Sequence, residues 1–342
     1  MFLIFLTLFL SVFIRSHADE LHISDSHGPI SIMGEHMHNE GEVMFSYRFS
    51  NMRMHGLLNG EKKIALREAM ASPNSASDNS GTYMNSPVEM RMDMHMFGAM
   101  YAPNNNLTLM LMTNYVEKEM KQERMPMSGS SRFDVNSSGI GDIRISGLIK
   151  ILQDNHQDAI LGIGLSIPTG SIDKRDVTPA SSNARLGYAM QNGTGTLDPF
   201  IFLNNVNNLG KFKIGEQILF KTNFSKHNSK GYHYGNLIDL KTWISYRWLK
   251  NLSTSLKINY KYQEKMFGSD NEMNKRMSPA MDSRNQGYNK LEFGFGLNFI
   301  NHKEFMKNNR LAIEFIFPVY QNLRGIQMSD SVNSIIGWQY SF

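Results

Sequence analysis

An alternation of apolar and polar residues with a period of two recurs from Val43 to the last residue, and it limits the fold more than any other feature. In the stretch 334–342, Ile336, Trp338, Tyr340 and Phe342 share one face of an extended strand, and the residues between them share the other. An aromatic edge of this kind would promote aggregation in water. Aromatic side chains are favourable at a membrane interface. We therefore predict that the final strand closes a lipid-facing sheet.

The same alternation predicts about twelve strands, within a range of about ten to fourteen. Strands are expected near 43–50, 88–102, 107–116, 142–151, 159–167, on both sides of turns at 207–210 and 250–251, and at 290–299, 311–319 and 334–342. Short and long connections alternate, and the strands run to about ten residues, longer than the usual 5–6 of soluble sheets. We predict an all-β fold, a transmembrane antiparallel β-barrel of bacterial outer-membrane type.

The N-terminal residues predict export. Residues 2–14 are almost all apolar, too short a run to span a bilayer as a helix. Ser16, His17 and Ala18 then supply a small-x-small cleavage site. We expect a signal peptide at 1–18, a periplasmic lead segment at 19–42 and the barrel at 43–342, located in the bacterial cell outer membrane.

Composition excludes several classes of function. No run of 18 apolar residues follows residue 18, which argues against helical spans. Cysteine is absent, so disulfides and thiolate ligands are excluded. The net charge of +4 is too small for a nucleic-acid-binding protein. We expect no cofactor, no nucleic-acid partner and no enzymatic activity.

The polar face of the strands predicts the lining of the barrel lumen. In 88–102 the alternation places methionines 90, 92, 94 and 96 opposite the charged residues, so we expect these methionines to face lipid. The predicted lumen-lining residues are Arg48, Arg91, Asp93, His95, Asp142, Arg144, Lys150, Asp239, Lys241, Arg247, Lys257, Lys261 and Lys290. Charges of both signs inside a barrel either pair and seal it or line a narrow polar channel.

Five segments carry a family resemblance: SIMGEHMHNEGEVMFSYRF (31–49), MRMDMHMFGAMYAP (90–103), SSGIGDIRISGL (137–148), GLSIPTGSID (164–173) and MQNGTGTLD (190–198). The chain resembles the transporter-like family of the MetA pathway of phenol degradation. The resemblance implies an outer-membrane barrel for passive transport of small solutes, aromatic and hydrophobic molecules among them, and it adds no catalytic residues.

The closing strand also resembles the C-terminal signature of outer-membrane barrels, which ends on Phe after alternating aromatic residues. This second resemblance implies two partners. They are outer-membrane lipid and the barrel-assembly machinery, which would recognise Trp338, Tyr340 and Phe342.

Two alternatives remain open. The 25 methionines and 11 histidines suggest an outer-membrane copper-binding or other metal-binding barrel, because thioether and imidazole ligands suit copper(I). The candidate ligands are His36, His38, Met52 and Met54, which share strand parity with Arg48. The stretch 227–231 weakly resembles the His-x-Ser-x-Gly motif of outer-membrane phospholipases, with Ser229 as the nucleophile, so a lipid hydrolase is the second alternative.

Overall fold

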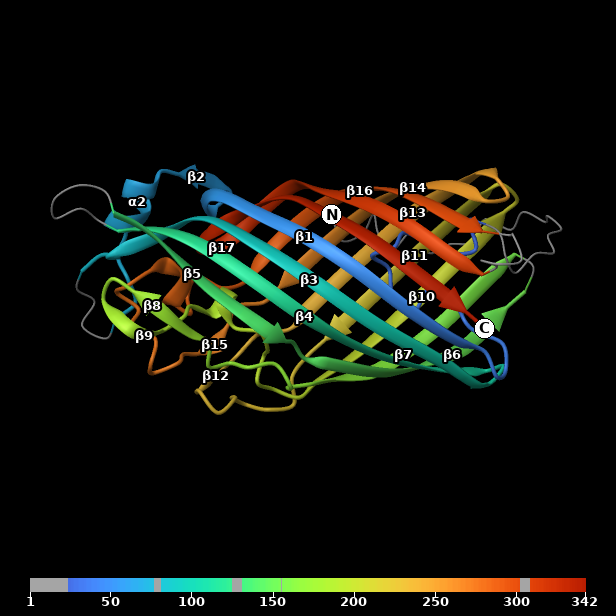
Figure 1. The fold of residues 1–342 in the computed structure, drawn as a ribbon, viewed down its shortest axis with the longest axis horizontal. Coiled ribbons are helices and arrows are strands. Elements are labelled where there is room, and N and C mark those ends of the chain that lie inside the picture. Colours follow the sequence, from blue (N-terminus) through green and yellow to red (C-terminus); the bar gives the residue numbers. More distant parts are fainter. Residues whose placement is uncertain (1–23, 77–80, 125–130, 155, 302–307) are drawn as a thin grey trace.

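Eleven labelled strands form a closed antiparallel ring in the computed structural model, which describes residues 24–76, 81–124, 131–154, 156–301 and 308–342 (Figure 1). Each strand bonds to the next one in sequence, and β17 bonds to β1 to close the ring. The ring comprises β1 (Val43–Gly60), β3 (Asn85–Asn104), β4 (Leu107–Arg124), β6 (Ile143–Gln153), β7 (Gln157–Ile167), β10 (Asp198–Leu209), β11 (Phe212–Lys221), β13 (Leu237–Leu249), β14 (Leu252–Gln263), β16 (Tyr288–Asn301) and β17 (Asn309–Ser341).

The element β17 contains a reversal of chain direction. Its residues up to Leu323 pair with β16, and those from Ile326 onward pair with β1, apart from one contact of Leu323 with Gly60. Gly325, with φ of 71°, lies between the two arms, and Arg310 donates a hydrogen bond to Gln339, 29 residues away. A closed ring of antiparallel pairs needs an even number of members. When the two arms of β17 are counted separately, the described chain contributes twelve strands to the barrel wall. This confirms the predicted fold.

Shorter elements lie at the end of the barrel opposite the C-terminus (Figure 1). β5 (Ser131–Ile140) extends the wall beside β4, and β2 (Lys62–Ile64) pairs with β1. The connections there contain α2 (Leu66–Ala71), the hairpin of β8 (Arg175–Thr178) and β9 (Ser181–Arg185), η1 (Tyr188–Met190), β12 (Tyr232–His233) paired with β15 (Phe267–Gly268), and η2 (Pro279–Met281). These long connections close over one mouth of the barrel.

The outer face of the barrel is apolar and exposed. Directly opposed residues share a face, so the register assigns Phe45, Ala99 and Leu111 to the outside. Exposed apolar side chains of this face include Phe97, Tyr101, Leu109, Ile163, Ile201, Ile258, Phe295, Ile336 and Trp338. Such a surface is stable against lipid rather than water. The protein is thus a barrel of the bacterial outer membrane. No helix among the described residues is long and apolar enough to cross a membrane.

The expected periplasmic lead segment lies inside the barrel instead, as far as it is described. We call residues 24–42 the plug segment. It contacts the wall all round: Ser24 bonds to β13 and β14, Ser31 to β17, and His38 to β4. Its backbone polar groups form hydrogen bonds with inward-facing polar side chains of the wall. The alternation of apolar and polar residues in the strands does not reveal that a segment of the chain occupies the lumen. Residues 1–23, which contain the expected signal peptide, are outside the described part.

Inward-facing glycines make room for aromatic rings in the lumen. A Cβ added to Gly162 would lie 2.0 Å from Cζ of Phe202, whose ring packs on the plug segment at Gly34. We expect Gly162→Val to destabilise the barrel by about 1–3 kcal/mol, the usual range for overpacking. The measurement is urea unfolding followed by the heat-modifiable gel shift. Gly147→Val is the control, because the nearest atom to its Cβ is 3.5 Å away on the outer face, and it should unfold like the wild type.

Candidate functional site: the plugged lumen and its outer cavity

The plug segment is held in the lumen by hydrogen bonds to its backbone carbonyls. Arg310 donates to the carbonyl of Gly28 over 2.5 Å, and Gln217 donates to the carbonyl of Met33 over 2.9 Å. Asn204 donates to the carbonyl of Gly34. Because these three donors come from β17, β11 and β10, the segment is fixed to opposite parts of the wall.

A buried ion pair anchors the centre of the segment. Lys257 on β14 and Glu314 on β17 are 2.5 Å apart, and their side chains are 1% and 0% exposed. Ser31 bonds to both, through its backbone N–H to Glu314 over 2.9 Å and through its hydroxyl to Lys257. Removing either charge would leave the other buried without its partner.

At the level of the plug segment the lumen is closed. The residual void beside Ile32, Glu35 and His36 has a volume of about 10 Å³, which is too small for a solute. Inward side chains of β1, β3 and β4 complete its lining. The plug segment therefore packs closely against the described part of the wall at this level.

The outer half of the barrel is filled by an apolar cluster beneath the long connections. Leu57, Met90, Met120 and Met328 of the wall pack with Ala69, Tyr83, Leu186 and Met190 of the connections. Buried polar contacts lock this packing, since Tyr83 and Ser75 donate to Asp282 over 2.9 and 2.6 Å. Burial acts to raise the pKa of the Asp282 carboxyl, but hydrogen bonds from Ser75 and the backbone of Arg284 outweigh it and keep this pKa below its usual value.

A cavity of about 350 Å³ opens at the edge of this cluster. It lies between the outer ends of β3, β4 and β5, the β8–β9 hairpin and the connection that contains η2. The apolar part of its lining consists of Met84, Phe133, Pro179, Ala180, Ala184, Leu186, Met277 and Met281. Eight polar residues complete it, among them Gln122, Asn274 and the charged Arg124, Arg185 and Glu272. This combination of size and lining suits a small, mostly apolar molecule.

A larger hollow, of about 1150 Å³, is formed on the outer wall. Phe45, Leu111, Ile163 and Ile201 contribute to it, and all four are exposed on the lipid-facing side. Because these residues face away from the lumen, the hollow is not part of a path through the barrel.

Nine of the predicted lumen residues lie in strands at positions that the register assigns to the inner face: Arg48, Arg144, Lys150, Asp239, Lys241, Arg247, Lys257, Lys261 and Lys290. Asp142, between β5 and β6, accepts hydrogen bonds from Gly170 and Thr194. Several of the charges pair with a carboxylate, as Lys261 does with Glu292 over 2.9 Å. Paired charges of this kind compensate each other inside the barrel.

Arg91, Asp93 and His95 lie on the opposite face from the predicted one. The register pairs His95 with Phe49 and Met96 with Arg48, so the methionines 90, 92, 94 and 96 face inward and the charged residues outward. The side chain of Arg91 is 53% exposed on the outside of the barrel. On the inside, Met90 packs in the apolar cluster. Here the wall meets water outside and an apolar filling inside, which inverts the polarity pattern of the membrane-spanning part.

The candidate metal ligands separate into two places. His36 and His38 lie together in the plug segment, with ring centroids 4.9 Å apart. Met54 packs against the apolar cluster at the outer end, and Met52 is opposite Met92 on β1 and β3. His27 and Glu35, which the sequence did not single out, lie beside His36 instead.

Ser229, the candidate nucleophile, is exposed in a turn closed by the hydrogen bond from Gly231 to Asn228. His227 packs against His233, with ring centroids 5.3 Å apart. Among the described residues, Ser229 makes no hydrogen bond with a histidine. This arrangement lacks the nucleophile–base contact that a serine hydrolase needs.

Comparisons with known proteins agree with the barrel. A family model described as "Putative MetA-pathway of phenol degradation" matches residues 73–306. The fold is similar to the COG4313 outer membrane channel from Pseudomonas putida F1, with a TM-score of 0.60 and 11% identity over 92% of this chain and 100% of that chain. A weaker likeness, with a TM-score of 0.46 and 11% identity, covers 89% of this chain and 91% of the TodX monoaromatic hydrocarbon channel deltaS2 mutant. No curated protein matches the sequence.

Proposed function

This chain belongs to the family described as "Putative MetA-pathway of phenol degradation", and from that membership we propose that it is a channel that passes small apolar molecules, phenols among them, passively across the outer membrane. The observation that carries the proposal is the cavity of about 350 Å³ at the outer mouth. Its Met, Phe and Leu side chains bind apolar groups, and its polar side chains can hold a hydroxyl.

Transport in this proposal is gated. The described lumen is closed by the apolar cluster in its outer half and by the plug segment below it. A solute bound in the outer cavity would pass inward along the methionines of β3 and β4 when these fillings shift. Met side chains suit such a path because they are flexible and apolar and adapt to different shapes.

The closing strand supports a further part of the proposal. Trp338 and Tyr340 lie on the outer face of the second arm of β17, next to β1, and Phe342 follows the strand with its ring against that of Tyr340. We assign to them the contact with the barrel-assembly machinery, with outer-membrane lipid as their partner after insertion.

Filling the outer cavity tests the proposal. We expect Ala184→Trp, which places an indole into the cavity from β9, to reduce the initial rate of phenol uptake to that of cells without the protein. Uptake is measured in bacterial cells that express the chain, with the folded amount in the outer membrane determined by the heat-modifiable gel shift.

Val177→Trp is the matched control. Val177 is on β8 of the same hairpin, is 62% exposed and is not part of the cavity lining. It should transport phenol like the wild type. Equal uptake by Ala184→Trp and Val177→Trp at equal folded amounts would contradict a role of the cavity.

A further inference from the structure

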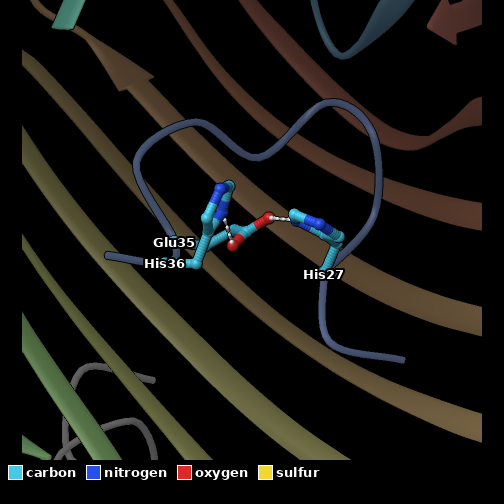
Figure 2. Close-up of side chains that lie close together, drawn as sticks. All are labelled: His27, Glu35 and His36. Carbon is cyan, nitrogen blue, oxygen red and sulfur yellow. Dashed lines mark hydrogen bonds and ion pairs between the residues drawn. The ribbon is translucent and has the colours of Figure 1, made fainter. Parts of the chain in front are cut away.

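Two histidines and a glutamate of the plug segment meet inside the barrel (Figure 2). Figure 2 shows the Glu35 carboxylate between the rings of His27 and His36, with the loop from residue 27 to residue 35 bringing them together. Nδ1 of His36 is 2.8 Å from Oε2 of Glu35, and Nδ1 of His27 is 3.5 Å from Oε1. One potential ligand atom of each residue lies within 4.8 Å of the others.

Ring nitrogens around this cluster are buried without a hydrogen-bond partner. They are Nδ1 of His27, Nε2 of His36 and Nε2 of His38. His38 is only 6% exposed, and its other nitrogen, Nδ1, is 3.3 Å from the carboxylate of Glu42. A histidine whose Nδ1–H is directed at a carboxylate presents the lone pair of Nε2, which is the usual arrangement of a metal-binding imidazole. An unsatisfied buried acceptor is costly unless a ligand meets it.

The protonation states suit a cation. Burial lowers the pKa of His27 to about 3 and that of His38 to about 4. Burial acts to raise the pKa of Glu35, but the neighbouring His36 and His27 hold it well below its usual range. Near pH 7, His27 and His38 are therefore neutral, as metal-binding imidazoles must be.

We propose that His27, Glu35 and His36 form a binding site for a divalent metal ion of the zinc type. Two imidazoles and one carboxylate are a donor set that Zn²⁺ accepts with tetrahedral geometry, and the fourth position falls to His38 or water. With metal–ligand bonds of about 2.0–2.1 Å, neighbouring ligand atoms of a tetrahedron are about 3.4 Å apart. The 3.5 Å between His27 and Glu35 is close to that separation.

The surrounding charges set limits on the affinity. Arg48 and Arg310 face the cluster and oppose a cation, while Glu314 lies close enough to both arginines to favour their charge. Arg310 is held by hydrogen bonds to Gly28, Asn298 and Gln339, so its guanidinium is directed at these oxygens. Glu42 adds a negative charge beside His38. We expect tighter binding than at a surface histidine pair and weaker binding than at a site built of thiolates.

A bound ion would link residue 27 to residues 35 and 36 and so close the turn of the plug segment. A ligand that binds only the folded barrel stabilises it, and the stabilisation rises with the logarithm of the ligand concentration once this exceeds the dissociation constant. The ion would thus favour the plugged form of the lumen. This role is separate from the passage of solutes proposed above.

The test is zinc binding to the full chain, refolded in detergent and freed of metal by chelation. We expect one Zn²⁺ per chain, measured by competition with a chromogenic chelator, and an upward shift of the thermal unfolding midpoint. His27→Gln/His36→Gln should lose both effects. If this variant does not fold, Glu35→Gln, which keeps the side-chain shape, takes its place with the same expectation.

His227→Gln/His233→Gln is the matched control. It also removes two adjacent imidazoles, but they belong to an outer connection, and among the described residues they do not form a cluster with a carboxylate. This control should bind zinc like the wild type. Absence of zinc binding by the wild type, or equal binding by His27→Gln/His36→Gln, would overturn the proposal. Neither outcome depends on transport, because the assay uses protein in detergent.

Discussion

A disulfide between Ile30→Cys and Gly337→Cys is expected to abolish phenol uptake in its oxidised form and to permit it in its reduced form. Ile30 belongs to the plug segment, and a Cβ at position 337 would lie 2.5 Å from Cγ1 of Ile30. The Cβ atoms of the two cysteines would therefore approach within the range that disulfides need. The bond would fix the plug segment to the second arm of β17 and keep the lumen closed. Uptake is measured in the same cells before and after addition of a reductant.

The chain supplies a clean background for this experiment, because it contains no cysteine. The single variant Ile30→Cys serves as the control and should transport equally with and without reductant, whereas Gly337→Cys alone is unsuitable because its Cβ would meet the side chain of Ile30. Formation of the disulfide is verified by mass spectrometry. If the oxidised double variant transports phenol as fast as the reduced one, the plug segment does not gate the channel.

Lys257→Met is expected to destabilise the barrel by about 3–5 kcal/mol, the usual cost of leaving one charge of a buried pair unpaired. The remaining charge would be Glu314, whose side chain is fully buried. The measurement is urea unfolding of the refolded protein, followed by tryptophan fluorescence. Trp243, which lies on the inner face next to the plug segment at Gly28, reports on the same region.

Two further variants identify the cause. Lys257→Met/Glu314→Leu removes both charges and should recover most of the lost stability, because a buried pair is often replaced by apolar residues at little cost. Lys62→Met breaks the exposed pair with Glu68, whose side chains are 72% and 49% exposed, and should change stability by less than about 1 kcal/mol. A double variant as unstable as Lys257→Met would show that packing, and not the unpaired charge, causes the loss.

The strands were predictable because the membrane imposes a simple rule on them. Where lipid is outside and polar groups are inside, apolar and polar residues must alternate, and the pairs around 207–210, 250–251 and 290–319 match β10 to β17 closely. The rule fails in the outer part of β3. There Arg91 faces water and Met90 faces an apolar cluster that long connections supply, so the same alternation has the opposite meaning.

The plug segment and its histidine cluster were not predictable in the same way. Residues 24–42 have no regular strand or helix, and their position depends on carbonyl groups meeting Arg310, Gln217 and Asn204, which are distant in sequence. His36 and His38 were visible as a pair, but His27 and Glu35 join them only because the chain turns between Pro29 and Ile32. The sequence shows that histidines and a glutamate are present in this segment. It does not show the turn between Pro29 and Ile32 that brings them together.

The most direct test of transport is the initial rate of phenol uptake in bacterial cells that lack their own porins, compared with and without this chain in the outer membrane. Our account predicts faster uptake of phenol with the chain, and no increase for a charged sugar phosphate, because the apolar side chains of the outer cavity, such as Phe133, Leu186 and Met281, cannot replace the water around its charges. Equal phenol uptake with and without the folded barrel would contradict it.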